Sequence, residues 1–198
     1  MTPLAQDVPA QFLIIAGPNG SGKSTSAPAV LPGPIPYVNA DEIAKGLPED
    51  PARNKDLRAG RILIEELDRL EAERADFAIE TTLASRSLVP RIARLQASGY
   101  RFHLLFFRVA SVEVSIARVA ERVRRGGHDI PEPTIRRRYA AGLRNFFSLY
   151  LPVADTWRVF DNTHIGDARL VASGRACAGI QIYDYQIWNR MKKEAGDG

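Results

Sequence analysis

Short apolar runs and longer amphipathic segments alternate along the chain. The continuous apolar runs predict five strands, the first buried on both faces as in a parallel sheet, at residues 12–16, 36–38, 77–79, 102–109 and 157–160. Apolar residues at helical spacing predict helices between them, at residues 42–46, 51–74, 88–97, 112–125 and 134–150. Asp50 is the expected N-cap of the longest helix.

Strands that alternate with helices are typical of βαβ units, which build a parallel sheet with helices on both faces. Two further apolar segments, 170–172 and 179–183, predict a small C-terminal β-hairpin, followed by a terminal helix. The 198 residues fit one domain of ordinary size. We therefore expect an α/β fold with a mainly parallel five-stranded sheet, in a single domain over residues 1–198.

Composition excludes several classes of protein. With 45% hydrophobic and 25% charged residues the chain is at the globular average, which excludes a disordered or fibrous protein. No apolar run approaches the roughly 18 to 20 residues that span a bilayer, and residues 1–11 are too polar for a secretory signal peptide. We expect a cytoplasmic protein with no membrane partner. The single cysteine, Cys177, excludes an intramolecular disulfide and is expected to be a small, part-buried side chain.

The basic residues of the chain are mostly arginines. The formal net charge is +4, and 22 of the 27 basic residues are arginines. The guanidinium fork suits phosphate and carboxylate oxygens, so the bias favours an anionic ligand. A GC-rich genome would give the same bias without a functional reason, and this alternative stays open.

One segment carries a specific phosphate-binding motif. Residues 17–25 match G-x-x-x-x-G-K-[ST] in full, between the first predicted strand and a predicted helix. This context favours a phosphate loop over a glycine-rich turn that contains Lys and Ser by chance. The expected nucleotide-binding residues of the loop are Gly17, Pro18, Asn19, Gly20, Ser21, Gly22, Lys23, Ser24 and Thr25.

The loop also predicts which nucleotide and which metal are bound. Its glycines let several N–H groups point at one anion, and the following helix adds its positive end. Lys23 can reach the β- and γ-phosphates, and the Ser24 hydroxyl can ligate Mg²⁺. A small GTPase would carry N-K-x-D and D-x-x-G, whereas this chain has Asn54-Lys-Asp-Leu57, one residue short, and no D-x-x-G. The sequence therefore predicts a P-loop NTPase fold that binds ATP with Mg²⁺.

Polar side chains follow the second and third predicted strands, where ligands of α/β sheets bind. A kinase needs a carboxylate near the γ-phosphate to take the proton of the acceptor hydroxyl, and Asp41 is expected in this role, although it could also cap the 42–46 helix. Glu80 can bind acceptor hydroxyls, hold the Mg²⁺ shell through water, or be a solvated strand-end carboxylate. Thr82 offers a hydroxyl to the same site. Arg86 can meet an anionic substrate group or be an ordinary exposed arginine.

Two basic helices flank a loop that contains Gly126-Gly127. Their arginines are Arg118, Arg122, Arg125, Arg136, Arg137 and Arg138. Such a pair suits a helical lid, around residues 118–140, that brings guanidinium groups to the transferring phosphoryl group. A solvated or nucleic-acid-facing basic surface is the alternative. His128, in the loop, is a lid hinge, a ligand residue or an exposed side chain.

In combination, these motifs resemble the zeta-toxin family of P-loop kinases and its small bacterial relatives. The matching segments are residues 17–25, Asn39-Ala-Asp-Glu42, Ile79-Glu-Thr-Thr-Leu83, Arg122 with Gly126-Gly-His128, and Asp161-Asn-Thr163. The resemblance spans about residues 12–163. The phosphate loop alone is shared by many families, whereas its combination with the Asp and E-T-T-L segments is more specific.

The resemblance implies a fold like that of nucleotide kinases. It also implies phosphorylation of a sugar hydroxyl of UDP-N-acetylglucosamine, which is the reaction of the toxins, and an antitoxin as protein partner. In this resemblance, Asp41 is the general base and Lys23 is the phosphate clamp. The acceptor site contains Asn39, Glu80 and Thr82, and the catalytic lid arginines are Arg122 and Arg138. Asp161 and Asn162 contact adenine or form a simple turn. The toxins carry an arginine two residues beyond the acceptor-site threonine. Here that position is Ala84, and Arg86 lies two residues further on.

We therefore expect an ATP-dependent kinase acting on a hydroxyl of a small molecule, with a UDP-amino sugar as the candidate acceptor. A polynucleotide 5′-hydroxyl kinase is an alternative, favoured by the basic helices, and it predicts salt-dependent binding to oligonucleotides. A nucleotide-dependent switch or binding module is another, but Asp41 and the missing guanine motifs count against it. A nucleic-acid partner is thus not the expectation. No Cys/His cluster suggests zinc.

Overall fold

The helices and strands follow one another in the predicted order. The computed structural model describes residues 8–48, 54–164 and 166–196, so the predicted cap Asp50 and the predicted helix start at residue 51 lie outside the described residues. The strands are β1 (Gln11–Ala16), β2 (Tyr37–Asn39), β3 (Phe77–Thr81), β4 (Arg101–Arg108), β5 (Thr156–Asp161), β6 (Arg169–Arg175) and β7 (Gly179–Ile182). The helices are α1 (Lys23–Val30), α2 (Ala40–Gly46), α3 (Lys55–Ala72), α4 (Leu88–Ala97), α5 (Val112–Arg124), α6 (Glu132–Asn145) and α7 (Tyr185–Gly196).

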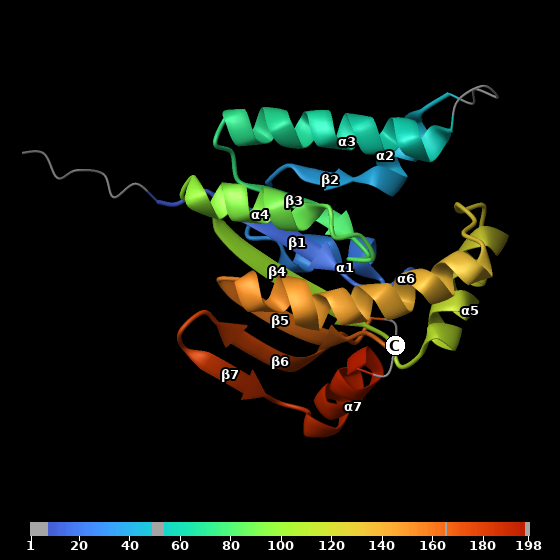
Figure 1. The fold of residues 1–198 in the computed structure, drawn as a ribbon. Coiled ribbons are helices and arrows are strands. Elements are labelled where there is room, and N and C mark those ends of the chain that lie inside the picture. The colour runs from blue at the N-terminus through green and yellow to red at the C-terminus, as the bar shows by residue number, and fades with distance from the viewer. Residues whose placement is uncertain (1–7, 49–53, 165, 197–198) are drawn as a thin grey trace, which may run out of the picture.

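All of these strands belong to one sheet, in the order β2-β3-β1-β4-β5-β6-β7 (Figure 1). The pairs from β2 to β5 are parallel. β6 and β7 pair antiparallel, so the predicted C-terminal hairpin is present but extends the same sheet to seven strands. The predicted α/β fold with a mainly parallel sheet is confirmed.

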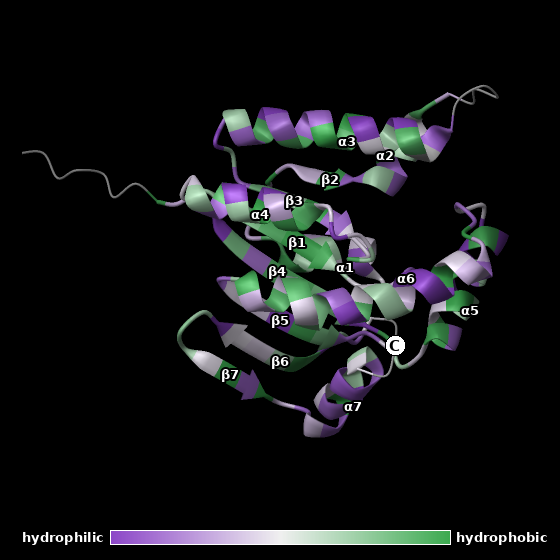
Figure 2. Cartoon of the chain, viewed as in Figure 1, coloured by the Kyte–Doolittle hydropathy of each residue, from purple (hydrophilic) through white to green (hydrophobic). Residues whose placement is uncertain are grey.

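The central strands are buried on both faces, as continuous apolar runs require. In β1, Phe12 and Ile14 point to one face of the sheet and belong to the main core, which α3, α4 and α7 also enter. Ile15 points to the other face and packs with Ala27 of α1. Figure 2 accordingly shows β1 and β3 mostly hydrophobic, while polar and apolar residues alternate along α3.

Helices cover the two faces of the sheet unequally. On the main-core side lie α3, α4, α7 and a π-helical turn, η1 (Phe146–Tyr150), which follows α6 and precedes a 3₁₀ turn, η2 (Leu151–Val153). On the other side of the sheet, the helical residues of the apolar cluster belong to α1. Toward β5, β6 and β7 this second face carries exposed side chains, among them Arg158 and Arg175.

Two local expectations differ from the structure. The helix predicted up to residue 150 is α-helical as far as Asn145 and then continues as η1. Cys177 was expected to be part-buried, which is wrong, because it is exposed in the turn between β6 and β7 and has a φ of 66°. Among the described helices, none combines the length and the apolar character needed to cross a membrane.

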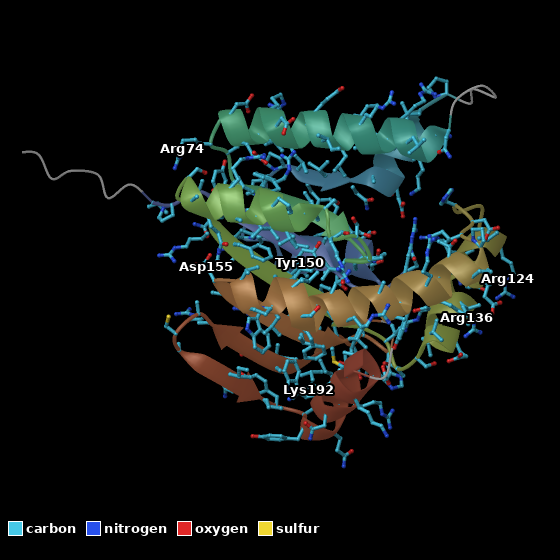
Figure 3. All side chains as sticks on the ribbon, viewed as in Figure 1. Arg74, Arg124, Arg136, Tyr150, Asp155 and Lys192 are labelled. Carbon is cyan, nitrogen blue, oxygen red and sulfur yellow. The ribbon has the colours of Figure 1, made fainter. Side chains whose placement is uncertain are left out.

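Asp155, labelled in Figure 3, connects the start of β5 to β4 and α4. Its carboxylate accepts hydrogen bonds from Phe102 N at 2.8 Å, Arg101 Nη1 at 2.8 Å and Gln96 Nε2 at 3.0 Å. Burial alone would raise the pKa of this carboxyl, but the three donors outweigh burial and lower it below the usual value.

We predict that Asp155→Ala lowers the free energy of unfolding at pH 7 by about 2 kcal/mol, because hydrogen bonds to a charged group are lost. A carboxyl with a lowered pKa stabilises the fold above its unfolded pKa and loses this effect as the pH falls through its folded pKa. The difference between wild type and variant should therefore shrink below about pH 4. Urea unfolding at pH 7 and at pH 3.5 measures both, with the exposed Asp167→Ala as control. A difference independent of pH would contradict the prediction.

Candidate functional site

The predicted polar clusters meet at the C-terminal edge of three adjacent strands. The parallel register places Asn39 of β2 beside Glu80 of β3. It also places Thr81 of β3 beside Ala16 of β1, directly before the phosphate loop. Segments far apart in the sequence therefore line one end of the sheet, as expected for a ligand site of an α/β fold.

The backbone of the phosphate loop has a shape that requires glycine at three of its positions. Positive φ angles occur at Gly17, Gly20 and Gly22. A Cβ at Gly17 would lie 2.1 Å from the carbonyl oxygen of Phe107, and a Cβ at Gly22 would lie 2.5 Å from Asn162 Nδ2. Because α1 begins at Lys23, directly after the loop, its positive end adjoins the curled backbone. This is a cradle suited to a phosphate chain.

Lys23 is buried beside the loop, with 6% of its side chain exposed. Its ammonium donates to the carbonyl oxygen of Pro18 at 3.0 Å and lies 3.7 Å from Glu80 Oε1. Burial lowers the pKa of Lys23, the negative charges of Glu80 and Asp41 oppose this, and the positive charge of Arg122 adds to the lowering. The charges predicted as base and lid arginine therefore both act on the predicted clamp.

Glu80 accepts two hydroxyl hydrogen bonds at the end of β3. Ser24 Oγ donates to Glu80 Oε2 at 2.7 Å, and the Tyr37 hydroxyl donates to the same oxygen. Only 10% of the Glu80 side chain is exposed, so the predicted solvated carboxylate is not what the structure has. Glu80 instead lies beside the hydroxyl that the motif assigns to Mg²⁺.

Tyr37 is a residue that the sequence analysis did not identify. It is part-buried on β2, and burial, followed by its hydrogen bond to Glu80, raises the pKa of its hydroxyl well above the usual value. The hydroxyl therefore stays protonated and keeps donating to Glu80. No motif marks it, because its role depends on β2 lying next to β3.

Asn39 and Asp41 have separate tasks at the start of α2. The Asn39 side chain is the N-cap and accepts from Asp41 N at 2.9 Å. The alternative that Asp41 caps this helix is wrong. Within the described part of the chain, the Asp41 carboxylate accepts no hydrogen bond, and it is half-buried near Lys23. It is therefore available to a ligand.

The segment after β3 is fixed by the helical layer. A Cβ at Gly142 of α6 would lie 2.2 Å from the Thr82 carbonyl oxygen, so α6 approaches this segment through a glycine. Asn145 Nδ2 donates to the carbonyl oxygen of Leu83 at 2.7 Å. The hydroxyl of Tyr150, labelled in Figure 3, donates to the carbonyl oxygen of Ser85 at 2.6 Å. Thr82 Oγ1 accepts a hydrogen bond from Ala84 N, 3.5 Å away in the same turn. Arg86 is exposed and, among the described residues, unpaired.

The predicted lid arginines have different surroundings. The Arg122 guanidinium donates to the His128 carbonyl oxygen at 2.9 Å, and its buried Nε has no partner in the described structure. Arg138 is half-buried on α6 and makes no hydrogen bond or ion pair with the described residues. Arg125, with 78% of its side chain exposed, pairs with Glu121 instead. Arg122 and Arg138 thus keep donors free among the described residues, whereas Arg125 is exposed and engaged with Glu121.

Arg118 holds the phosphate loop against the segment after β5. Its guanidinium donates to the carbonyl oxygens of Gly20 at 3.3 Å, Asn162 at 2.8 Å and Thr163 at 2.7 Å. Asn162 Nδ2 in turn donates to the Ser21 carbonyl oxygen at 2.7 Å. These side chains are therefore engaged in shaping the loop.

Asp161 is likewise engaged within the protein. Its carboxylate lies 3.1 Å from Arg108 Nη1 and 3.7 Å from Arg169 Nη2, and it accepts from Thr163 N at 3.2 Å. The adenine contact predicted for Asp161 and Asn162 stays a prediction.

The residues at the loop fit a nucleotide and Mg²⁺ chemically. Buried polar atoms without a partner among the described residues include Asn19 Oδ1 and Ser21 Oγ of the loop, and Arg122 Nε. The Ser24 hydroxyl and the Glu80 carboxylate supply the hard oxygens that Mg²⁺ prefers. No group of three or more metal-binding side chains occurs in the residues described, so the protein alone offers few ligands, as in sites where substrate phosphates complete the shell.

Comparison with known proteins agrees with this geometry. A family model described as an AAA domain matches residues 12–145. An uncharacterized protein of Haemophilus influenzae is 31% identical over 127 residues, which make up 64% of this chain and 91% of that protein.

Solved structures share the fold at low identity. The AvrRxo1-ORF1:-ORF2 crystal structure with ATP has a TM-score of 0.69 at 17% identity, and the match covers 92% of this chain but only 63% of the other. A structure of the PezAT chromosomal toxin–antitoxin system of Streptococcus pneumoniae has a TM-score of 0.56 at 15% identity and covers 98% of this chain and 88% of the other. The fold is therefore a kinase-like P-loop fold.

Proposed function

The chain belongs to the AAA-domain family, and from this premise we propose that it is an ATP-dependent kinase that transfers the γ-phosphate to a hydroxyl of a small molecule. One observation carries the proposal: the half-buried Asp41 carboxylate, which accepts no hydrogen bond from the described residues, closely follows β2, whose last residue lies beside Glu80, and Glu80 lies 3.7 Å from the Lys23 ammonium. A protein that only binds nucleotide needs the clamp but not the free carboxylate. Asp41 therefore favours transfer to an acceptor.

In the proposed reaction, the loop N–H groups and the Lys23 ammonium hold the β- and γ-phosphates. Asp41 takes the proton of the acceptor hydroxyl while the acceptor oxygen forms a bond to the γ-phosphorus. The bond between the γ-phosphorus and the β–γ bridging oxygen breaks, which releases ADP. Arg122 and Arg138 stabilise the negative charge on the transferring group. Bound Mg²⁺ would neutralise phosphate charge, held by Ser24 and, through water, by Glu80.

The acceptor we propose first is a UDP-amino sugar. Its support is the motif resemblance in residues 39–42 and 79–83. The PezAT likeness adds only the fold, because the identity is 15%. At the departure from the family pattern, Ala84 stands where an arginine is expected, and Arg86, two residues further on, is exposed and has no side-chain partner among the described residues, so it is free to contact a diphosphate.

We also propose a protein partner of the antitoxin type. PezAT is a toxin–antitoxin system, and AvrRxo1-ORF1 was crystallised with AvrRxo1-ORF2. In this chain such a partner would cover the edge of the sheet that holds Asp41 and the phosphate loop, since blocking that edge prevents transfer.

A polynucleotide acceptor has less support. Three of the α5–α6 arginines at the periphery, of which Arg124 and Arg136 are labelled in Figure 3, pair with glutamates, whereas the exposed Arg137 has no side-chain partner among the described residues. Arg124 and Arg125 both pair with Glu121, and Arg136 pairs with Glu113 and Glu132. Much of the positive charge expected to attract a nucleic acid is thus neutralised locally.

The proposal is tested by ADP release from Mg²⁺-ATP, with and without UDP-N-acetylglucosamine, nucleosides, free sugars or a 5′-hydroxyl oligonucleotide. Acceptor-dependent release by one of the small molecules supports it. Stimulation by the oligonucleotide alone would favour the polynucleotide kinase. Slow release that no acceptor changes would favour a nucleotide-dependent switch.

We predict that Tyr37→Phe raises the Mg²⁺ concentration for half-maximal activity by about tenfold, while kcat at saturating Mg²⁺ changes less than about threefold. Losing the Tyr37 hydroxyl leaves Glu80 less well oriented, and outer-shell partners of a metal site typically contribute 10- to 100-fold in metal affinity. Steady-state rates over a Mg²⁺ titration measure the effect. Tyr183→Phe, at an exposed tyrosine, is the control. An unchanged Mg²⁺ dependence would remove Tyr37 from the account.

A further inference from the structure

The sheet face on the α1 side forms a groove over β4 to β7. Its volume is about 590 Å³, which lies within the usual range for small-ligand sites. Thr156, the first residue of β5, and His103, near the start of β4, line it. The groove therefore lies toward the N-terminal ends of β4 and β5, away from the edge of the sheet that holds the phosphate loop. None of the groups in the proposed transfer reaction lines it.

The lining of the groove is positive. Two arginines, Arg158 and Arg175, supply its positive charge, and none of its described lining residues is acidic. The side chains of Arg158 and Arg175 form no ion pair or hydrogen bond with the described residues, in contrast to the paired arginines of α5. Isolated guanidinium groups on one surface repel each other unless an anion lies between them.

The strand register places these two arginines close together. Arg158 is opposite Ser173, and Thr156 is opposite Arg175, so the arginines are diagonal neighbours on one face of the β5–β6 pair. Such neighbours have Cβ atoms at most about 7 to 8 Å apart, within reach of two long side chains for a shared ligand. The hydroxyls of Thr156 and Ser173 lie between them on the same face.

His103 forms a fixed part of this surface. Its Nδ1 lies 2.6 Å from Thr156 Oγ1 and its Nε2 lies 2.5 Å from Gln11 Oε1, so the ring is held from both sides. The Gln11 oxygen can only accept, so Nε2 donates to it and Nδ1 can accept from the Thr156 hydroxyl. Burial lowers the pKa of His103, the negative charges of Asp155 and Asp76 oppose this, and the positive charges of Arg101 and Arg158 add to the lowering.

We infer that this groove is a second ligand site, which binds a small molecule carrying phosphate or carboxylate groups between Arg158 and Arg175. The polar lining suits a charged ligand more than an apolar one, and two guanidinium groups with the adjacent Ser173 hydroxyl match the oxygens of such an anion. The inference does not depend on the proposed kinase activity, since the two sites share no lining residue.

The three histidines of the chain allow the two sites to be observed separately. His103 is in the groove, whereas the His128 carbonyl oxygen accepts from Arg122, and His164 follows Thr163, whose carbonyl oxygen accepts from the same Arg118 that contacts Gly20 of the phosphate loop. The experiment follows the ¹H–¹³C signals of the histidine rings of the full chain. The probes are inorganic phosphate, pyrophosphate and succinate, each compared with NaCl at equal ionic strength. His103→Gln assigns the groove signal.

We expect at least one probe to move the His103 signal in a saturable way and to raise the pKa of His103, because an added anion favours the charged ring. The phosphate and succinate arms decide between a phosphorylated and a carboxylate ligand. Pyrophosphate at the phosphate loop would instead move His128 or His164. The combined R158Q and R175Q variant should weaken the His103 response by about tenfold or more, whereas the exposed Arg190→Gln on α7 should leave it unchanged.

Two results would overturn the inference. One is a His103 signal that responds to all three probes no more than to NaCl. The other is a response of equal strength in the R158Q and R175Q variant with a folded spectrum, which would mean that the anion binds elsewhere. In either case the groove is a solvated polar face of the sheet.

Discussion

Replacing Lys23 with alanine is expected to lower kcat/KM for phosphoryl transfer by at least about 10³-fold. The ammonium is buried beside the loop, 3.7 Å from Glu80 Oε1, and donates to the Pro18 carbonyl oxygen. Without it, a triphosphate in the loop keeps the backbone N–H groups but loses the buried ammonium. Rates with Mg²⁺-ATP and the identified acceptor measure the loss.

Two comparisons make this result specific. Lys45→Ala removes a lysine whose side chain is 55% exposed on α2 and should leave the rate within about twofold. Because Lys23→Ala also leaves Glu80 without its cation, circular dichroism must show that the variant is folded. A folded variant that still transfers phosphate at more than a tenth of the normal rate would contradict the assigned clamp.

Replacing Asp41 with asparagine is expected to lower kcat by about 10² to 10⁴-fold while the affinity for ATP stays within about threefold. Asparagine keeps the size of the side chain, and the helix cap is preserved because Asn39 provides it through Asp41 N. The negative charge is lost, and with it the capacity to take a proton. Rapid-quench kinetics together with calorimetric ATP binding separate the two quantities.

The neighbouring Glu42→Gln is the matched control for Asp41, since it removes an exposed carboxylate that pairs with Lys45 in the same helical turn. It should leave kcat nearly unchanged. If the Asp41 and Glu42 variants lose activity equally, the effect belongs to the charge of α2 and not to a general base. If Asp41→Asn loses ATP affinity as much as kcat, Asp41 holds nucleotide instead.

The fold was predictable because its signals are local and repeated. A buried strand followed by the phosphate-loop motif specifies β1, the loop and α1 together, and alternating strands and helices imply the parallel sheet. The unequal covering of the two faces was not predictable in this way. It depends on which strands α1 reaches, and a short helix beside a seven-stranded sheet leaves part of one face open.

The candidate site was predictable where a residue follows a strand end. Asp41 and Glu80 lie near Lys23 because the strands before them are neighbours in one sheet. Roles that depend on contacts between distant segments could not be read from the sequence. Tyr37 gains its role only when β2 lies beside Glu80, and Arg118 shares a helical face with Arg122 but holds the loop backbone instead.

Phosphorus NMR of the full protein with Mg²⁺-ATP and a hydroxyl acceptor tests the central claim most directly. The acceptors are UDP-N-acetylglucosamine, other amino-sugar nucleotides, nucleosides, free sugars and a 5′-hydroxyl oligonucleotide, each with the Lys23→Ala variant as control. The account predicts a new phosphomonoester signal on a small molecule, in equal amount to the ADP formed and absent with the variant. ADP accompanied only by inorganic phosphate across the whole panel and a metabolite extract, or a phosphomonoester found only on the oligonucleotide, would contradict it.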